Sequence, residues 1–597
     1  MKRDKKAAQK NKAEPSLAAP KSREVVFWET CAAHPYLTAL VLCLFLNGFT
    51  LGAMSNIPNN AVYLVALCLP LVTAYCVYRL FREGILDRTK AWAAGGLIVL
   101  AELIMTKLYS TSEHPQHIVL ILCECIVLAI CLLMRFSSLR GQIRTFAVFG
   151  LSFVLKFYYI LYTSCYTRQH DFGVFHGTGE GDGGHTGYIE YLLYNHHLTD
   201  FNVMDHSQYY HPPLHHALCA VWIHINENIL GVGFDQARES LQTLSLFYSM
   251  CIIITAYRIL RYFKLEGAAL YAPFLIVAFH PCFILLSGQL NNDVLSIAFM
   301  MGAVLCTLYW YRERTLKNIL KIALCVGLGM MTKISAGLVA PPIALVFLIV
   351  FIRDFKQDVW KLVRQFVIFG CVCIPLGLWF GIRNFIKWRV PLTYVVRLPE
   401  GLLQYIGEQD YGKRITDFSL YQFESVFENW LAIDEAGNRV SYNEFNPLVT
   451  LLKNSLFGEF IHADSFAEGS WGVGFSFLLF WIAVLVAALA VVSLVIVCCS
   501  HAGKTGAAPT EKALFASFYV LQMVSFYKMA ADYPFTCTMN FRYITPTVII
   551  GALFLGMLVR QLGEHHPKAA RPAAVTATAL SGAFALCSMV VYVELGG

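Results

Sequence analysis

The sequence contains few charged residues. Asp, Glu, Lys and Arg make up 14% of its 597 residues, against 57% hydrophobic residues. A soluble domain of this composition would expose large apolar surfaces to water. The apolar residues gather instead in many runs of about 20, the length that a helix needs to cross the hydrocarbon core of a bilayer. The composition excludes an ordinary soluble enzyme and predicts an all-α polytopic membrane protein.

The sequence also lacks the spaced motifs of common metal sites. It has no CxxC pair and no HExxH motif, although Cys and His at such spacings are typical of zinc sites. Most of its 19 cysteines lie inside apolar runs, where cysteine behaves as a small hydrophobe. Cys165 and Cys537 fall at the ends of such runs and could form a bridge outside the membrane. We expect no cofactor, with a divalent metal as the alternative.

The charges that are present indicate how the chain crosses the membrane. The net charge of +7 is better explained by basic cytoplasmic loops than by a nucleic-acid surface. Residues 1–28 open with the Lys-rich MKRDKKAAQKNK and are predicted to be a cytoplasmic tail, because no small-residue cleavage site follows the first apolar run. The basic segments RLFREGILDRTK, RFSSLRGQIR and YRERTLKNILK then fall on the same side. Basic residues are concentrated in the cytoplasmic loops of membrane proteins, which is the positive-inside rule. This rule predicts a cell-membrane protein of about fifteen spans, with its N-terminus in the cytoplasm and its C-terminus outside.

The predicted spans alternate consistently, with one exception. Residues 213–230 look helical but carry His224, Asn226 and Glu227, and we predict a partly embedded helix with both ends outside. The predicted spans are Tyr36–Ala53, Ala61–Phe81, Trp92–Tyr109, Ile118–Met134, Phe146–Tyr162, Leu241–Leu260, Ala268–Leu286, Val294–Tyr311, a short helix ending at Lys333, Ala336–Phe351, Val363–Phe380, Gly474–Cys498, Ala513–Met529, Tyr543–Val559 and Ala574–Val591.

These spans suggest five regions. After the tail, an accessory N-terminal transmembrane block (29–145) precedes every polar motif, and a catalytic transmembrane core (146–382) contains the first outer loop (166–216). An extracytoplasmic loop (383–473) and C-terminal transmembrane helices (474–597) complete the chain.

The first outer loop concentrates polar residues. The stretch HDFGVFHGTGEGDGGHTGYIEYLLYNHHLTDFNVMDHSQYYHPPLHH runs from His170 to His216 and holds half of the 18 histidines. Three further polar groups are predicted on the same side: SGQLNND, Lys333, and the RN pair with CTMNFRY. This places acids and isolated cations at the depth of a lipid phosphate. A carboxylate there can deprotonate an incoming hydroxyl, and a cation can stabilise a departing phosphate.

The order of these motifs resembles a known family. Asp171, GHxxYIxYL, QxYHPPLHH, SGQxNND, TK and FRYxxP follow one another as in the GT-C membrane glycosyltransferases, in the branch of the dolichyl-phosphate-mannose protein mannosyltransferases and the bacterial aminoarabinose transferases. The resemblance covers roughly residues 146–559. It implies a GT-C-like helical bundle with extracytoplasmic loops. It also implies a sugar donor linked to a polyprenyl phosphate, transfer outside the cytoplasm with inversion, and an acidic base in the first loop.

Residue by residue, the resemblance makes Asp171 the expected catalytic base. The family often has an acidic pair at this position, whereas here Phe172 follows Asp171. Glu180 and Asp182, within GTGEGDGGH, are the alternative bases. The remaining candidates bind substrate, with phosphate contacts expected from the cations: Lys333, Arg542, Arg383, His211, Tyr210, Asn292, Asp293 and His185.

Each candidate also has a purely structural interpretation. Lys333, Arg542 and Arg383 could be interfacial cations, and Asn292 and Asp293 could cap the helix that follows. The expected function is a glycosyltransferase whose acceptor is a glycan, a lipid or a protein hydroxyl. The first alternative is a polytopic transporter or lipid-linked glycan flippase, whose ionisable residues should lie near the bilayer midplane. The second is a metal-dependent membrane hydrolase, which requires the loop histidines to converge.

Overall fold

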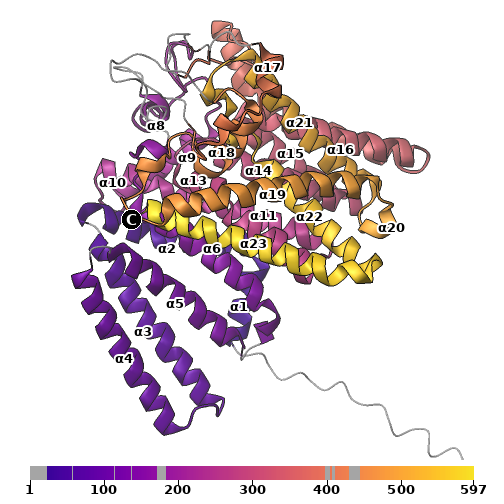
Figure 1. Ribbon diagram of the computed structural model, residues 1–597. Helices are drawn as coiled ribbons and strands as arrows, with labels where there is room; N and C mark the ends of the chain where they lie inside the picture. The colour runs from indigo at the N-terminus through magenta and orange to yellow at the C-terminus, as the bar shows by residue number, and fades with distance from the viewer. Residues whose placement is uncertain are drawn as a thin grey trace, which may run out of the picture.

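The computed structural model describes residues 23–56, 58–112, 115–135, 138–170, 183–396, 398, 404–406, 410–428 and 444–596. Within these ranges every named element is a helix (Figure 1), and the bridge between Tyr405 and Phe535 is an isolated pairing of strand type. The predicted all-α architecture is therefore confirmed.

Eleven helices in the described ranges are long and apolar enough to cross a membrane, or twelve if the bent pair α1 and α2 counts as one span. A multi-pass membrane protein is thus confirmed, whereas the predicted count of about fifteen spans is not. Part of the difference lies in α16, which has 49 residues and non-helical dihedral angles at Asp358. At 1.5 Å per residue it would measure about 74 Å, more than twice a hydrocarbon core of about 30 Å. The two spans predicted there correspond to the two parts of this one helix.

The N-terminal helices form a group in which α3, α4 and α5 project from the rest of the molecule, while α2 packs against it (Figure 1). Among them α4 has no buried residue, as expected of a helix that faces lipid. The group consists of α1 (Arg23–Ala33), α2 (Pro35–Asn56), α3 (Pro58–Arg82), α4 (Arg88–Thr111) and α5 (Pro115–Arg135). A buried hydrogen bond of 2.7 Å from Asn47 of α2 to Asn226 of α9 joins the group to the core.

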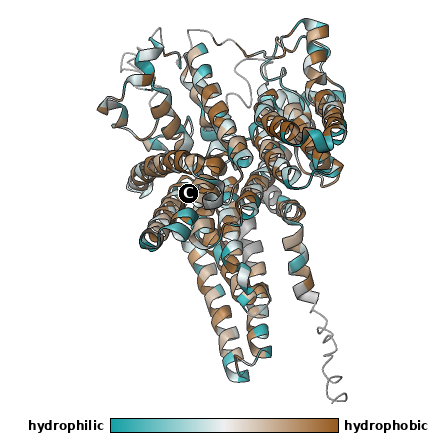
Figure 2. Cartoon of the chain, turned by 90° about the vertical axis from the view of Figure 1, so that its right-hand side faces the viewer, coloured by the Kyte–Doolittle hydropathy of each residue, from teal (hydrophilic) through white to brown (hydrophobic). Residues whose placement is uncertain are grey.

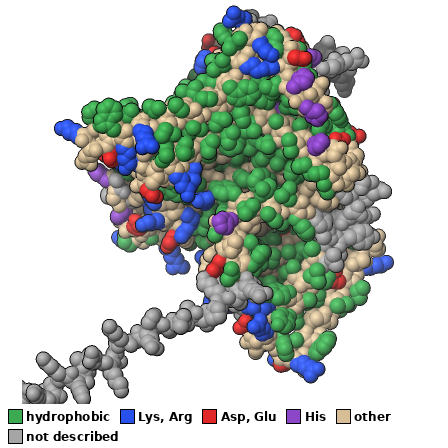
Figure 3. Space-filling model, turned by 180° about the vertical axis from the view of Figure 1, so that it is seen from behind, with side chains coloured by type: hydrophobic (Ala, Val, Ile, Leu, Met, Phe, Trp, Pro, Cys, Tyr) green, Lys and Arg blue, Asp and Glu red, His purple; other side chains and the backbone are tan. Residues whose placement is uncertain are grey.

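The core is a bundle of long helices whose ends gather at two opposite sides. The turn inside α16 and the short α20 lie at one end, while α8, α10 and the C-terminus lie at the other (Figure 1). Figure 2 shows that the long helices are apolar over most of their length, and Figure 3 shows a broad apolar face with charged side chains mainly at its margins. The core helices are α6 (Ile143–Tyr162), α11 (Leu241–Tyr262), α12 (Gly267–Phe279), α13 (Pro281–Gly288), α14 (Asp293–Arg312), α15 (Leu316–Thr332), α16 (Ala340–Trp388), α19 (Gly472–Cys499), α21 (Pro509–Asp532), α22 (Pro546–His565) and α23 (Pro567–Leu595).

Shorter elements connect these helices. The α-helices among them are α8 (Gly184–Asn195), α9 (Leu214–Asn228), α10 (Phe234–Glu239), α17 (Tyr411–Thr416), α18 (Pro447–Phe457) and α20 (Ala502–Thr505). The 3₁₀ helices are η1 (Ser138–Gln142), η2 (Arg168–His170), η3 (Ile334–Val339), η4 (Leu420–Phe423), η5 (Ala463–Ser465), η6 (Thr536–Met539) and η7 (Phe541–Ile544). The 15 residues of α9 extend over about 22 Å, which is shorter than a bilayer core.

The single span predicted at Ala268–Leu286 is two helices, because Pro281 has no N–H and breaks the hydrogen-bond ladder between α12 and α13. The carbonyl groups freed at the end of α12 find side-chain donors. Lys156 Nζ lies 2.7 Å from the oxygen of Ala278, and Ser588 Oγ lies 2.6 Å from that of Phe279. Lys156 is fully buried and was not singled out in the sequence. These bonds fix the direction of α13 and of the SGQLNND segment that begins in it.

Candidate active site

The centre of the candidate site is Asp293, which lies between two cations. Its Oδ1 is 2.5 Å from Lys333 Nζ, and its Oδ2 is 3.7 Å from Arg542 Nε. The side chain of Asp293 is 6% exposed, and those of Lys333 and Arg542 are 13% and 14% exposed. The ring of Tyr543 contacts both cations, at 5.1 Å from Lys333 Nζ and 5.4 Å from the Arg542 guanidinium carbon. Three positions that are distant in the sequence therefore form one charged cluster.

All three charges lie at helix ends. Asp293 is the first residue of α14, where the helix dipole favours a negative charge, and Lys333 follows the last residue of α15, where it favours a positive one. Arg542 lies in η7, the short turn before α22, and its N–H donates to Asn540 Oδ1 at 3.0 Å. The cluster thus lies at the end of the bundle and not halfway along its helices.

Three histidines from the first outer loop stack beside this cluster. The His185 ring lies 5.8 Å from that of His211 and 5.2 Å from that of His216, with both pairs nearly parallel. His185 Nδ1 and His216 Nε2 share a hydrogen bond of 2.9 Å. Lys333 and Arg542 act electrostatically on both His185 and His211. The HPPL motif and the GHxxYIxYL motif therefore meet at the cation cluster.

These histidines are uncharged at neutral pH. Burial lowers the pKa of His185 well below its ordinary value, and neighbouring histidines and cations add to this effect. Burial, followed by Lys333, lowers the pKa of His211 in the same way. His215 is bonded to the oxygen of Leu290 at 3.3 Å, and burial lowers its pKa to about 4. Neutral imidazoles remain hydrogen-bonding groups without adding positive charge.

The other predicted substrate residues have different surroundings. Tyr210 packs on His211, with ring centroids 4.4 Å apart, and interacts electrostatically with Arg542 and Asp293. Asn292 donates to the oxygen of Thr332 at 3.2 Å and so ties α14 to α15. The structure therefore places Tyr210 and Asn292 next to the charged cluster.

Arg383 makes contacts with a different set of residues. It donates to the backbone oxygen of Thr199 and, at 2.8 Å, to Asn384 Oδ1, and its guanidinium carbon lies 4.9 Å from the Trp388 ring centre. These contacts hold Arg383 between α16 and the loop after α8.

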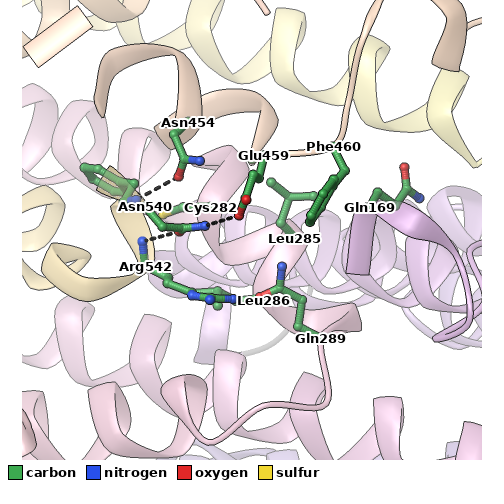
Figure 4. A pocket seen from close by; sticks show the side chains of 12 residues that line it. Gln169, Cys282, Leu285, Leu286, Gln289, Asn454, Glu459, Phe460, Asn540 and Arg542 are labelled. Carbon is green, nitrogen blue, oxygen red and sulfur yellow. Dashed lines mark hydrogen bonds between the residues drawn. The ribbon is translucent and has the colours of Figure 1, made fainter. Parts of the chain in front are cut away.

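A small pocket adjoins the cluster on the side of Arg542 (Figure 4). It lies between the end of α13, the end of α18 and the turn before α22. Polar side chains supply much of its wall, among them Gln169, Gln289, Asn454, Glu459, Asn540 and Arg542. Glu459 lies in the loop 383–473, where Arg383 was the only predicted site residue, and no motif in that loop could have identified Glu459.

The three predicted acidic bases, Asp171, Glu180 and Asp182, lie outside the described residues. The residue before Asp171 is well defined: His170 is buried, its Nε2 lies 2.9 Å from the Tyr159 hydroxyl, and its Nδ1 lies 2.8 Å from the oxygen of Ser164. Gln169 lines the same pocket as Arg542. The chain therefore reaches the first outer loop from a fixed position beside the pocket.

Two alternatives considered from the sequence can be compared with the structure. Cys165 and Cys537 are both free thiols, and the Cys165 thiol lies 2.8 Å from Glu239 Oε2. The predicted possibility of a bridge between them is therefore wrong. Among the described residues, no group of three or more His, Cys, Asp or Glu side chains is arranged to hold a metal ion. The histidines pair with one another and with backbone groups instead.

Comparison with known proteins bears on the same region. No curated protein sequence matches the chain. A protein-family model does match residues 211–379, a segment that includes His211, Asp293 and Lys333 and ends before Arg542. This match supports a membrane glycosyltransferase of GT-C type that uses a lipid-linked sugar. Residues 211–379 match the model of the dolichyl-phosphate-mannose-protein mannosyltransferase family, and over this segment the match agrees with the resemblance inferred from the motifs.

Proposed function

We propose that the protein transfers a sugar from a polyprenyl-phosphate donor to an acceptor hydroxyl on the extracytoplasmic face of the membrane, with inversion at the anomeric carbon. The observation that carries the proposal is the cluster of Lys333, Asp293 and Arg542, which lies at a helix-end boundary within a membrane protein. A phosphate attached to a membrane lipid lies at this kind of boundary.

The charges of the cluster suit such a donor. Two cations and one carboxylate, all ionised, leave a net charge of +1. A sugar joined to a lipid through a phosphodiester carries one negative charge at neutral pH, so the bound donor would neutralise the cluster. When the sugar leaves, negative charge grows on the phosphate, and preorganised cations stabilise this change. Lys333 and Arg542 both lie beside Asp293, at 2.5 and 3.7 Å, so a phosphate bound there can contact either cation.

The chemical step needs a base opposite the leaving phosphate. In the proposal, the Asp171 carboxylate takes the proton of the acceptor hydroxyl, and the acceptor oxygen forms a bond to the anomeric carbon. The bond between that carbon and the phosphate oxygen breaks, and the electron pair leaves with the polyprenyl phosphate. The proton ends on Asp171. Support comes from its sequence neighbours, since His170 is anchored and Gln169 lines the pocket that Arg542 also lines.

The neutral histidines and Tyr210 would complete the donor site. Because their imidazoles are uncharged, His185 and His211 would position the phosphate or the sugar without changing the charge balance. The Tyr210 ring packs against His211 at a tilt of 43° and offers a flat apolar surface to a sugar ring.

A transporter or flippase is less well supported. Transport sites with coupled ions are expected near the bilayer midplane. Here Asp293 begins α14, Lys333 follows α15 and Arg542 lies in the turn before α22. All three charges therefore lie at helix ends, at one end of the bundle. This position favours chemistry at the membrane surface.

The proposal can be tested with the purified full-length protein in proteoliposomes. A panel of polyprenyl-phosphate sugars, beginning with the mannose form, would be supplied with and without an acceptor mixture. We expect release of free polyprenyl phosphate from at least one donor, and none from the double variant Lys333→Met/Arg542→Met. If ordered, monodisperse protein consumes no donor in the panel but moves an intact lipid-linked sugar between leaflets, the flippase alternative is correct.

A further inference from the structure

The pocket beside Arg542 has an unusual lining for a region at the end of a membrane bundle. Its polar wall consists largely of amides, from Gln169, Gln289, Asn454 and Asn540, with one carboxylate and one guanidinium. The rest of the wall is apolar and includes the side chains of Phe460 and Leu285 (Figure 4). Amide and carboxylate groups can donate to or accept from hydroxyls, so this lining suits a neutral, hydroxyl-rich ligand.

Glu459 is the acidic group of this pocket, and it is held in place. It is 6% exposed. Gln404 Nε2 donates to its Oε1 at 2.5 Å, and Asn540 Nδ2 donates to its Oε2 at 3.4 Å. Asn540 in turn accepts the N–H of Arg542, and Asn454 accepts that of Phe541 at 2.7 Å. Glu459, Asn454 and Asn540 are therefore joined by hydrogen bonds to each other or to the backbone of residues 541 and 542, which leads into the cation cluster (Figure 4).

Charge and size restrict what can enter. Glu459 and Arg542 carry opposite formal charges, and Arg542 is shared with Asp293 of the cluster. Its free volume is about 30 Å³, which is room for about two water-sized groups. One or two hydroxyls of a larger molecule fit this space.

The position of Arg542 indicates which hydroxyls these are. The same side chain lies 3.7 Å from Asp293 on one side and lines the pocket on the other. A sugar ring bonded to a phosphate that is held by Lys333 and Arg542 must lie within a few ångströms of that arginine. The hydroxyl edge of the donor sugar is therefore the neutral group nearest to the pocket.

We propose that this pocket binds the hydroxyl edge of the sugar carried by the lipid phosphate, and that Glu459 accepts a hydrogen bond from one of its hydroxyls. The inference rests on the proposed function and adds to it a specificity site formed by the loop helix α18 and the turn before α22. It assigns sugar recognition to Glu459 and phosphate recognition to Lys333 and Arg542. Donors whose edge hydroxyls are free should bind more tightly than the bare lipid phosphate.

The test compares two probes on the full-length protein in detergent micelles: polyprenyl-phosphate mannose and bare polyprenyl phosphate. Binding is measured by competition with a radiolabelled lipid phosphate. Glu459→Gln should weaken binding of the mannose lipid by about 10- to 150-fold, the loss expected for a hydrogen bond to a charged group. The same variant should leave binding of the bare lipid within about twofold. Glu468→Gln, an identical change at an exposed position of the same loop, serves as the matched control and should change neither.

Other variants separate this inference from the proposed function. Lys333→Met should weaken both probes by a similar factor. If it does, while Glu459→Gln alters neither probe, the phosphate site stands and the sugar pocket is overturned. If Glu459→Gln raises only the KM for the acceptor, the pocket belongs to the acceptor and our assignment to the donor is wrong. Should the wild type bind neither lipid, the proposed function fails, and this inference fails with it.

A second substitution protects the test against misfolding. Gln169→Met removes a pocket amide, with little change of side-chain volume, at a partly exposed position. It should reproduce a smaller selective loss for the mannose lipid in protein that melts at the wild-type temperature. An equal loss for both lipids in both pocket variants would contradict a role in sugar recognition.

Discussion

Replacing Lys333 with methionine should weaken the binding of polyprenyl phosphate by about 10- to 150-fold. Lys333 Nζ lies 2.5 Å from Asp293 in a cluster that is largely shielded from solvent. A hydrogen bond to a charged group contributes about 1.5–3 kcal/mol, and about 1.4 kcal/mol corresponds to a tenfold change in affinity. The substitution removes one such bond to the phosphate. It also frees Asp293 to pair more closely with Arg542, so the remaining cation becomes less available.

The charge balance of the cluster extends this prediction to a series. The formal charge of the three groups is +1 in the wild type, 0 in Lys333→Met, +2 in Asp293→Asn and +1 in the double variant Lys333→Met/Asp293→Asn. We expect the affinity for polyprenyl phosphate to follow this order. The double variant should therefore bind more tightly than the single Lys333→Met variant, although it lacks one more native group.

The assay is equilibrium binding of polyprenyl phosphate to purified protein in micelles, repeated at two salt concentrations. Melting temperatures of all variants are measured in parallel, because removing one member of a buried ion pair can cost stability. Lys333→Arg, which keeps the charge, is the matched control and should retain most of the affinity. If the double variant binds no better than Lys333→Met, or if Lys333→Met binds within about threefold of the wild type, the charge argument is wrong.

Three further predictions concern the surroundings of the site. Burial is the main cause, and two neighbouring carboxylates the second, of a Glu428 pKa well above its ordinary value. The folded protein therefore holds this proton more tightly than the unfolded chain does. The stability that Glu428 contributes is fully present below about pH 4 and is lost as the pH rises through the folded pKa. Glu428→Gln should raise the melting temperature at pH 8 and leave it unchanged at pH 4, and parallel melting curves at both values would contradict this. In Gly288→Ala the new methyl carbon would lie 2.5 Å from His170 Nε2, so the buried His170 ring must shift, sugar transfer should fall at least tenfold and the melting temperature should drop; undiminished transfer would show that the position of His170 is unimportant. Asn226→Ala would leave the buried Asn47 amide without its 2.7 Å bond, at a cost of about 1–3 kcal/mol, seen as a lower melting temperature; an unchanged melt would show that the bond contributes little.

Much of the helical framework could be predicted, because apolar runs and basic loops are local signals. The predicted short helix ending at Lys333 corresponds to α15, which ends at Thr332 with Lys333 as its C-cap. The predicted span at Val294–Tyr311 corresponds to α14. Because successive spans cross the membrane in alternating directions, the polar residues at their ends lie at one membrane surface or the other. This reasoning brought Asp293, Lys333 and Arg542 to the same boundary.

Which cation would pair with Asp293 at that boundary could not be predicted. Whether Asp293 would contact Lys333, 40 positions later, or another cation depends on the packing of α14 against α15. No sequence pattern encodes this packing. The family resemblance made Asp293 a residue that binds substrate, and the structure adds that it is the counter-ion of two cations. Arg383 carries the same charge as Lys333 and Arg542, but its guanidinium contacts Thr199 and Trp388.

Other features left no signal in the sequence. Lys156 lies in an apolar span where a lysine is unexpected, and its role became visible only with the break between α12 and α13. Glu459 lies in a loop with many acidic residues, and only the fold shows that it faces Arg542 across a pocket. Both cases depend on contacts between segments that are far apart in the chain.

In the proposed mechanism, a carboxylate at the start of the first outer loop activates an acceptor for attack on a lipid-phosphate sugar. The most direct test is the rate of sugar transfer by Asp171→Asn in proteoliposomes, with Glu180→Gln and Asp182→Asn as matched neutral substitutions in the same loop. We predict that Asp171→Asn loses transfer by at least a thousandfold and still binds the donor, while the other two variants keep most of their activity. Full transfer by Asp171→Asn, or a complete loss confined to Glu180→Gln or Asp182→Asn, would contradict the assignment.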